Sequence, residues 1–197
     1  MLFYNENAES YAASTFNSDF AVAVFEGMKS IVDTLDKEKA ILDIGCGSGR
    51  DANHLTSLGY TVHAFDQSKE MIQQAESLTG LNGVFNVGSA QAFETSHNYD
   101  FAYSIACLLH LNDEEFLNAV THIASHLNNN GHFYFTVKKG TGEETDAAGR
   151  YFNYYNSDKL NRVVEQVDNL NLVEIVENPD LTRPDTTWLN VVLQKTA

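Results

Sequence analysis

Ile41-Leu42-Asp43-Ile44-Gly45-Cys46-Gly47-Ser48-Gly49-Arg50 places three glycines, spaced two apart, directly after a short apolar run. Residues 40–44 are typical of a buried strand and residues 50–58 favour a helix, so the glycines lie at a strand-to-helix turn. Glycine lets the backbone turn tightly and lets a ligand approach without interference from a Cβ atom. The first turn of the helix would present free N–H groups at the same place.

Helical and strand patterns alternate along the rest of the chain, which favours an α/β sheet with helices on both faces. Because the last two predicted strands are separated by only about ten residues, they must pair antiparallel. A turn is expected at 128–131 and a mobile polar loop at 138–150. Further helices are expected at 19–36, after a Ser68 cap, after a capping box at Asn112 and Glu115, and after a Ser157 cap; further strands are expected at 60–65, 83–87, 99–106, 132–137, 172–176 and 188–193.

The length of 197 residues fits one domain, and 43% hydrophobic with 20% charged residues excludes a disordered chain. No apolar run approaches the ~20 residues of a membrane span. The N-terminus lacks the pattern of a signal peptide. Two cysteines are too few for a disulfide framework. We therefore expect a single cytoplasmic domain over 1–197, without a membrane partner.

The charge balance is strongly acidic. Asp and Glu total 27 against 12 Lys and Arg, a formal net charge of −15. Nucleic acid of any length would be repelled, because non-specific affinity for it comes from neutralising phosphates. A nucleic-acid partner is therefore not expected, although a small local basic site remains compatible with this charge.

Two acids frame the glycine turn. Asp66 ends the second predicted strand, where a carboxylate can accept hydrogen bonds from both hydroxyls of a ribose. Asp43 lies at the strand-to-turn junction, where it can receive an ammonium group directly or through water. The two acids together suit a ligand with an amino-acid end and a nucleoside end.

Two cofactors compete for this pattern. A dinucleotide site would read Gly-x-Gly-x-x-Gly, but Arg50 stands at the position of the third glycine. Asp43 would also repel a pyrophosphate. S-adenosylmethionine carries an α-ammonium group and no phosphate, so the same acid favours it.

Asp-Ile-Gly-Cys-Gly-Ser-Gly at 43–49 resembles motif I of the class I S-adenosylmethionine-dependent methyltransferases. The segments at 62–68 with Met71, 88–90, 99–110 and 130–132 resemble later motifs of that family, and the match covers roughly 4–195. The resemblance implies a Rossmann-like seven-stranded, mostly parallel sheet in the order 3-2-1-4-5-7-6, with strand 7 antiparallel.

The resemblance also implies a cofactor site. Ser89 replaces the acid usual at its position, and Arg50 could instead pair with a nearby acid. Residues 1–18 would cap the cofactor. The implied contacts to S-adenosylmethionine, or to its product S-adenosylhomocysteine, are Tyr11, Asp43, Gly45, Cys46, Gly47, Gly49, Arg50, Asp66, Gln67, Met71, Ser89, Ala90, Gln91, Ser104 and Ile105.

The acceptor should enter at the carboxyl ends of the strands, over the cofactor. Basic residues gather there in a chain with few of them, which indicates an anionic acceptor, although solvated loop charges would give the same pattern. His110 is the candidate catalytic base, with a helix-start or pocket-wall role as the alternative. The candidate acceptor contacts are His110, Lys138, Arg150, Tyr151, Arg183 and Trp188.

A narrower resemblance, carried by residues 49–51, 149–152 and 183–190, is to small bacterial methyltransferases similar to the tellurite-resistance type. We expect methyl transfer to a small-molecule acceptor by a monomer or a homodimer. The alternatives are a non-catalytic S-adenosylmethionine-binding domain and, less favoured, an NAD(P)-dependent oxidoreductase. No metal site is expected, because His122 and His126 lack a third ligand.

Overall fold

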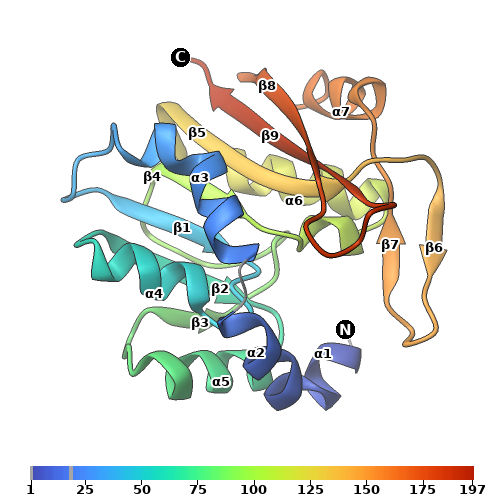
Figure 1. Ribbon diagram of the computed structural model, residues 1–197. Coiled ribbons are helices and arrows are strands. Elements are labelled where there is room, and N and C mark those ends of the chain that lie inside the picture. The colour runs from blue at the N-terminus through green and yellow to red at the C-terminus, as the bar shows by residue number, and fades with distance from the viewer. Residues whose placement is uncertain (1, 18–19) are drawn as a thin grey trace.

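The computed structural model describes residues 2–17 and 20–197, and its main sheet has the strand order β3-β2-β1-β4-β5-β9-β8 (Figure 1). Neighbours from β3 to β5 pair in parallel, whereas β9 is antiparallel to both β5 and β8. The predicted α/β class, strand order and antiparallel seventh strand are confirmed. The strands of this sheet are β1 (Ala40–Ile44), β2 (Thr61–Asp66), β3 (Phe85–Val87), β4 (Tyr99–Ser104), β5 (Leu127–Lys138), β8 (Leu170–Pro179) and β9 (Thr187–Lys195).

Helices cover both faces of this sheet, and two further helices lie beside α5 near the N-terminus (Figure 1). On one face α3, α4 and α5 pack against the strands, and on the other α6 and α7 do so. The helices are α1 (Leu2–Glu6), α2 (Ala8–Phe16), α3 (Phe20–Val32), α4 (Arg50–Ser57), α5 (Lys69–Thr79), η1 (Leu108–His110), α6 (Asp113–Ser125) and α7 (Ser157–Val164).

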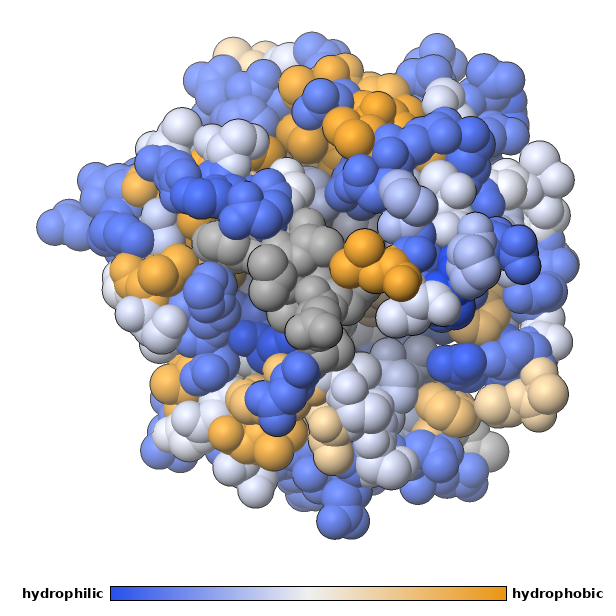
Figure 2. Space-filling view, viewed as in Figure 1, coloured by the Kyte–Doolittle hydropathy of each residue, from blue (hydrophilic) through white to orange (hydrophobic). Residues whose placement is uncertain are grey.

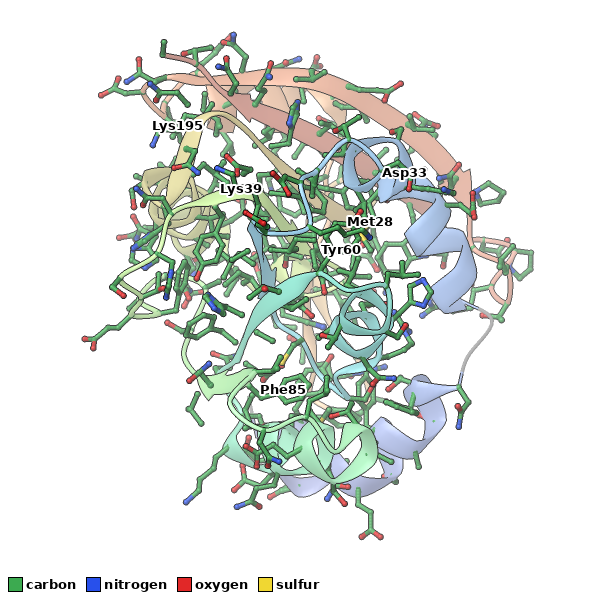
Figure 3. The ribbon with its side chains drawn as sticks, turned by 90° about the vertical axis from the view of Figure 1, so that its left-hand side faces the viewer. Met28, Asp33, Lys39, Tyr60, Phe85 and Lys195 are labelled. Carbon is green, nitrogen blue, oxygen red and sulfur yellow. The ribbon has the colours of Figure 1, made fainter. Side chains whose placement is uncertain are left out.

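Neighbouring residues of the central strands feed two separate cores. Ile41 belongs to a cluster that includes Met28, Tyr60 and Phe85, three residues labelled in Figure 3, whereas Leu42 belongs to the cluster under α6 and α7. Successive side chains of a strand point to opposite faces, so a strand buried on both faces reads as a continuous apolar run. The apolar run of β1 has this cause.

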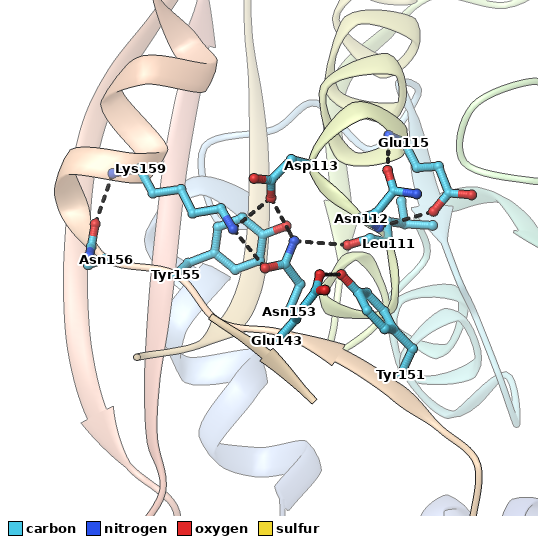
Figure 4. Close-up of polar contacts among 10 residues, drawn as sticks. All are labelled: Leu111, Asn112, Asp113, Glu115, Glu143, Tyr151, Asn153, Tyr155, Asn156 and Lys159. Carbon is cyan, nitrogen blue, oxygen red and sulfur yellow. Dashed lines mark hydrogen bonds and ion pairs between the residues drawn. The ribbon is translucent and has the colours of Figure 1, made fainter. Parts of the chain in front are cut away.

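Two of the three predicted N-terminal helix caps are confirmed. The Ser68 hydroxyl accepts from the Met71 N–H at 3.1 Å, and Asn112 with Glu115 forms a complete capping box (Figure 4). The prediction of Ser157 as a cap was wrong, because the Asn156 side chain accepts from the backbone of the new helix. Asn and Ser are equally good caps, so adjacent candidates cannot be separated by residue type.

Other boundaries also differ from expectation. Helix α3 ends at Val32, short of residue 36, and its expected start at Asp19 lies outside the described residues. Residues 128–131 were predicted as a turn but belong to β5. Asn130 has a φ of +67°, so the signal at this position marks an irregularity within a strand.

The segment predicted as a loop at 138–150 is also different. Strands β6 (Glu143–Thr145) and β7 (Tyr151–Asn153) pair antiparallel as a small hairpin that stands beside the main sheet (Figure 1). Asp146 fixes its tip, since its carboxylate accepts from two backbone N–H groups and from the Arg150 guanidinium. A polar composition thus forms an ordered turn because side-chain hydrogen bonds replace an apolar core.

Asn153 anchors the base of this hairpin. Its amide donates to the Leu111 carbonyl oxygen at 3.1 Å and to Asp113 at 2.8 Å, and it accepts from Lys159 at 2.7 Å (Figure 4). Asn153 is only 2% exposed, so these bonds are shielded from water. They tie the hairpin to the first turn of α6.

In the view of Figure 2 hydrophilic residues occupy most of the visible surface, with several apolar patches between them. Among the described helices none has the length and apolar character to cross a membrane.

Cys46 and Cys107 are both free thiols.

Candidate functional site

The strand order reverses between β1 and β4, which opens a crevice at the carboxyl ends of these strands. Two adjoining cavities occupy it. The first, of about 210 Å³, lies between the glycine turn, the end of β2 and α5. The second, of about 550 Å³, extends from the glycine turn toward the β8–β9 turn. Both share Tyr4, Tyr11 and His110 as wall residues.

The glycine turn is tightly packed. Gly45 has a φ of +76°, and a Cβ atom there would lie 2.3 Å from the Cys107 Sγ. The N–H groups of Gly45 and Cys46 donate to the Phe65 carbonyl at 2.7 and 3.1 Å, and that of Gly47 donates to Asp66 at 3.0 Å. These donors are therefore engaged within the protein, which is unlike a loop that cradles phosphate.

Gly49 has a different role from the first two glycines. It precedes α4 with a φ of +74°, and a Cβ atom there would lie 2.7 Å from the Phe85 ring. It lines neither cavity. The glycine lets α4 and β3 approach each other closely.

Asp66 is the polar group at the end of β2. Its carboxylate accepts from the backbone N–H groups of Gly47 and Ser68, at 3.0 and 2.9 Å. Burial raises its pKa, while these two hydrogen bonds oppose the rise. Each oxygen retains a further lone pair, so the group can accept two more hydrogen bonds from a ligand in the first cavity.

Asp43 lies on the wall of the second cavity and is 3% exposed. The Tyr103 hydroxyl donates to it at 2.7 Å. Burial raises the pKa of Asp43 well above its usual range, and the nearby Asp51 carboxylate raises it further. A cationic ligand group would favour the ionised carboxylate, so this site is suited to an ammonium.

Arg50 joins the glycine turn to α2. Its guanidinium donates to both oxygens of Asp51, at 3.0 and 2.7 Å, and to the Thr15 carbonyl at 3.4 Å. The pairing with an acid that the sequence left open is therefore present. Arg50 also lines the second cavity.

His110 is bonded through both ring nitrogens. Nδ1 lies 2.6 Å from the Tyr151 carbonyl oxygen, and Nε2 lies 2.7 Å from the Tyr4 hydroxyl. A carbonyl oxygen only accepts, so Nδ1 carries the proton and the Tyr4 hydroxyl donates to Nε2. Burial lowers the pKa of His110 to about 4, which keeps the imidazole neutral near pH 7.

Four Lys and Arg side chains line the second cavity, and three of them have acidic partners, Arg50 with Asp51 as described above. Arg150 pairs with Asp146, and Arg183 pairs with Asp180. Lys138 instead lies with its Nζ 3.8 Å from the Phe152 ring centroid. Among the described residues no carboxylate lies within 4.0 Å of that ammonium. Burial lowers the pKa of Lys138, and repulsion from Arg183 and Arg150 lowers it further, while the more distant Glu144 and Asp146 carboxylates oppose the shift.

Asp180 organises the turn between β8 and β9. It accepts from the Arg183 guanidinium at 2.6 Å and from the Trp188 Nε1–H at 2.8 Å. Burial opposes ionisation, but these bonds and those from Thr182 outweigh it and hold the pKa of Asp180 well below its usual range. The turn is thereby fixed against the second cavity.

Most of the predicted site residues line one cavity or both. Gly49, Ser89 and Ser104 line neither. Within 2–17 and 20–197 no cluster of three His, Cys, Asp or Glu side chains could hold a metal. The predicted residues that line the cavities are Tyr11, Asp43, Gly45, Cys46, Gly47, Arg50, Asp66, Gln67, Met71, Ala90, Gln91, Ile105, His110, Lys138, Arg150, Tyr151, Arg183 and Trp188.

The structure adds wall residues that the sequence did not single out, among them Tyr4, Ala106, Cys107 and Asp180. Ala106 has a φ of +50°, an uncommon conformation for a residue with a side chain. Such strain often lies at functional sites, but alanine gives no signal of it in the sequence. Tyr4 reaches His110 across 106 positions, a distance that no local pattern spans.

Comparison with known proteins agrees with this architecture. Residues 41–131 match the family described as a methyltransferase domain. A probable S-adenosyl-L-methionine-dependent methyltransferase, TehB of Haemophilus influenzae, is 30% identical over 122 residues, which cover 56% of this chain. The chain spans 42% of the length of that relative.

Solved structures show the same fold. A S-adenosylmethionine-dependent methyltransferase from Clostridium acetobutylicum superposes with a TM-score of 0.74 at 14% identity, covering 98% of this chain and 99% of its own. The 1,6-didemethyltoxoflavin-N1-methyltransferase of Burkholderia thailandensis, solved with S-adenosylhomocysteine, gives 0.70 at 20% identity, covering 98% and 89%. The motif, the strand order and the matched domain agree: residues 41–131 match a methyltransferase domain, and the chain has the fold of the S-adenosylmethionine-dependent methyltransferases that it resembles.

Proposed function

We propose that this protein transfers the methyl group of S-adenosylmethionine to a small molecule that carries an anionic group. One observation carries the proposal. The two adjoining cavities place Asp66 at one end, Asp43 at the glycine turn and the Lys138 ammonium beyond it. A nucleoside, an amino-acid group and an anion would meet complementary side chains in that order.

The residues of the first cavity suit the nucleoside. Asp66 would accept hydrogen bonds from the two ribose hydroxyls, since both of its oxygens retain lone pairs. Gln67, Met71, Ala90 and Gln91 line the same cavity and would border the adenine. Asp43 would face the α-ammonium, directly or through water.

S-adenosylmethionine supplies a methyl group already activated by its sulfonium, so the acceptor forms its bond to the methyl carbon as the carbon–sulfur electron pair returns to sulfur. The protein then has to align the acceptor and exclude water. Tyr4, Tyr11 and Ile105 line both cavities and would surround the transfer position. Where the reacting atom of the acceptor is itself unprotonated, no residue has to take a proton from it.

The second cavity suits an anionic acceptor. The charges of Arg150 and Arg183 are shared with Asp146 and Asp180, whereas Lys138 lacks such a partner among the described residues. An anion beside Lys138 would relieve its repulsion from both arginines. This charge pattern supports an anionic acceptor and does not identify the atom that receives the methyl group.

Two other functions were compatible with the sequence. An NAD(P)-dependent oxidoreductase would need donors for a pyrophosphate, but the N–H groups of Gly45, Cys46 and Gly47 are engaged and Asp43 is adjacent. A non-catalytic S-adenosylmethionine-binding domain would have the same first cavity. Turnover distinguishes that alternative from an enzyme.

Calorimetric titration with S-adenosylmethionine, S-adenosylhomocysteine and NAD⁺ tests the cofactor. We expect micromolar binding of both sulfur ligands, weakened about a hundredfold in Asp66→Ala because two charge-assisted hydrogen bonds are lost. Asp33→Ala, which removes an exposed carboxylate paired with Lys29, is the matched control and should bind normally. Binding of NAD⁺ alone would establish the oxidoreductase instead.

An acceptor screen tests the reaction. The protein is incubated with S-adenosylmethionine and small anions or thiols, and S-adenosylhomocysteine is quantified. We expect turnover with an anionic acceptor and none with its neutral ester. Tight binding of S-adenosylmethionine without turnover on any compound would support the non-catalytic alternative.

A further inference from the structure

Helix α1 and the β6–β7 hairpin meet over the first cavity, although they are about 145 residues apart in the sequence. The Phe3 ring centroid lies 5.0 Å from the Arg150 guanidinium carbon. The Tyr4 hydroxyl lies 2.7 Å from His110 Nε2, and His110 Nδ1 lies 2.6 Å from the Tyr151 carbonyl oxygen. His110 thus joins one element to the other through two short hydrogen bonds.

The two elements differ in how firmly they are held elsewhere. The hairpin is fixed at its base by Asn153 and at its tip by Asp146. Helix α1 has five residues, and Tyr4 packs with Tyr11 against a small cluster formed by Ala8, Ala12 and Met71. A five-residue helix is not stable on its own, so the position of α1 depends on its tertiary contacts, and the bonds to the hairpin are among them.

We propose that Tyr4 and His110 form a latch that holds α1 against the β6–β7 hairpin and closes the first cavity over the cofactor, with His110 as a positioning residue and not a base. The part that concerns the cofactor rests on the proposed function. The part that concerns the position of α1 stands on the protein alone.

The hydrogen bonds of His110 support its assignment as a positioning residue and not a base. A general base must have a free lone pair within hydrogen-bond reach of the acceptor. The Nδ1 proton is held by the Tyr151 carbonyl, and the Nε2 lone pair is held by the Tyr4 hydroxyl. The Tyr4 proton is likewise committed, so its oxygen can offer only a lone pair to the cavity.

Hydrogen exchange in the ligand-free protein tests the latch. Tyr4→Phe keeps the ring and removes the hydroxyl, and we expect the backbone amides of α1 to exchange about tenfold faster. Tyr154→Phe is the matched control, because it removes a phenol bonded to Glu144 in the same hairpin but outside both cavities. Unchanged α1 exchange in Tyr4→Phe would overturn the latch.

The release rate of S-adenosylhomocysteine tests what the latch closes. We expect release about tenfold faster in Tyr4→Phe and in His110→Ala. His110→Gln should be closer to wild type, since one amide can donate to Tyr151 and accept from Tyr4. The double variant Tyr4→Phe/His110→Gln should add nothing to Tyr4→Phe alone.

Single-turnover methyl transfer separates positioning from base catalysis. A positioning role predicts that His110→Gln keeps its methyl-transfer rate within about threefold of wild type. A hundredfold lower rate with unchanged release of S-adenosylhomocysteine would make His110 a base and overturn the assignment. If the wild-type protein binds neither sulfur ligand, the proposed function is wrong, and so is the inference that the latch closes over a cofactor. Hydrogen exchange of the α1 amides still tests whether Tyr4 and His110 hold α1 against the hairpin.

Discussion

The two cavities of the crevice are built in different ways. The base of the first is made by consecutive strand ends, with Gly45, Asp66 and Met71 set by the backbone of β1, β2 and α5, and α1 and the β6–β7 hairpin meet over it. The second is made by side chains from distant segments, such as Lys138 at the end of β5 and Asp180 after β8. A cavity made by the backbone depends on the fold itself, whereas one made by side chains can change while the fold persists.

The largest expected effect follows from breaking the backbone of the first cavity. In Gly45→Ala the new methyl group would meet Cys107 Sγ and Cβ, at 2.3 and 2.5 Å, and the φ of +76° adds strain. We expect the free energy of unfolding to fall by about 3 kcal/mol, as for strain combined with overpacking. S-adenosylmethionine binding should become undetectable. Urea unfolding and calorimetry measure the two effects.

Gly80→Ala is the matched control for this prediction. Gly80 has a φ of +69°, but no atom lies within 4 Å of its would-be Cβ. Gly80→Ala should lower the free energy of unfolding only by the strain of the positive φ, about 1–2 kcal/mol, and should leave the affinity for S-adenosylmethionine unchanged. Equal losses in the two variants would show that Cys107 gives way and that the turn is less rigid than its packing indicates.

The next largest effect should come from the N-terminal helices. Deleting residues 1–17 removes Tyr4 and Tyr11 from the cavity walls but leaves both main cores. We expect about a hundredfold weaker binding of S-adenosylmethionine, about 2.7 kcal/mol, with cooperative unfolding retained. Loss of cooperative unfolding would contradict the idea of a separate cap.

A pair of neighbouring alanines on α2 provides the point-variant form of this test. Ala12 is fully buried against the cluster with Met71, whereas Ala13 is exposed. Ala12→Asp should weaken cofactor binding as the deletion does, because an unpaired carboxylate cannot enter that contact. Ala13→Asp should bind normally.

The same contrast explains what the sequence could predict. Asp43, Gly45 and Asp66 belong to short segments whose glycines, acids and apolar runs report the local backbone. The strand order came from family resemblance, and the antiparallel end followed from the short connection before β9. Around the first cavity the local sequence patterns and the strand order indicate the same residues, so most of its wall residues could be predicted.

Other features depend on contacts that local patterns do not encode. The Tyr4–His110 bond arises only when distant segments meet. The polar composition of residues 138–150 predicts a mobile loop, whereas the structure has the β6–β7 hairpin there, ordered by side-chain bonds to Asp146 and Asn153. Gly49 fits the motif, but its spacing alone does not separate ligand contact from helix packing.

Two adjacent lysines give a sharper test of the second cavity. Lys138 lines it, whereas Lys139 pairs with Glu177 at the surface. With an anionic acceptor, Lys138→Met should raise KM about tenfold, about 1.4 kcal/mol, and leave the affinity for S-adenosylhomocysteine unchanged. Lys139→Met should alter neither. An equal KM for both variants would remove Lys138 from acceptor binding.

The smallest expected effect concerns the boundary between the two cavities, where His110 lies. Its pKa is lowered to about 4 by burial, against about 6.5 in an unfolded chain. Between these values the unfolded state binds more protons than the folded state, so acidification favours unfolding. From about pH 6.5 to 5.5 this should remove about 1 kcal/mol of stability.

His110→Gln isolates this contribution, because the acids and the other histidines titrate equally in both proteins. The stability advantage of wild type over the variant should shrink by about 1 kcal/mol across that interval and stay constant above about pH 7.5. Urea unfolding at several pH values measures it. A constant difference throughout would mean that water reaches the imidazole, and the Tyr4 bond would then be an open contact at the cavity edge, no longer a seal between α1 and the hairpin.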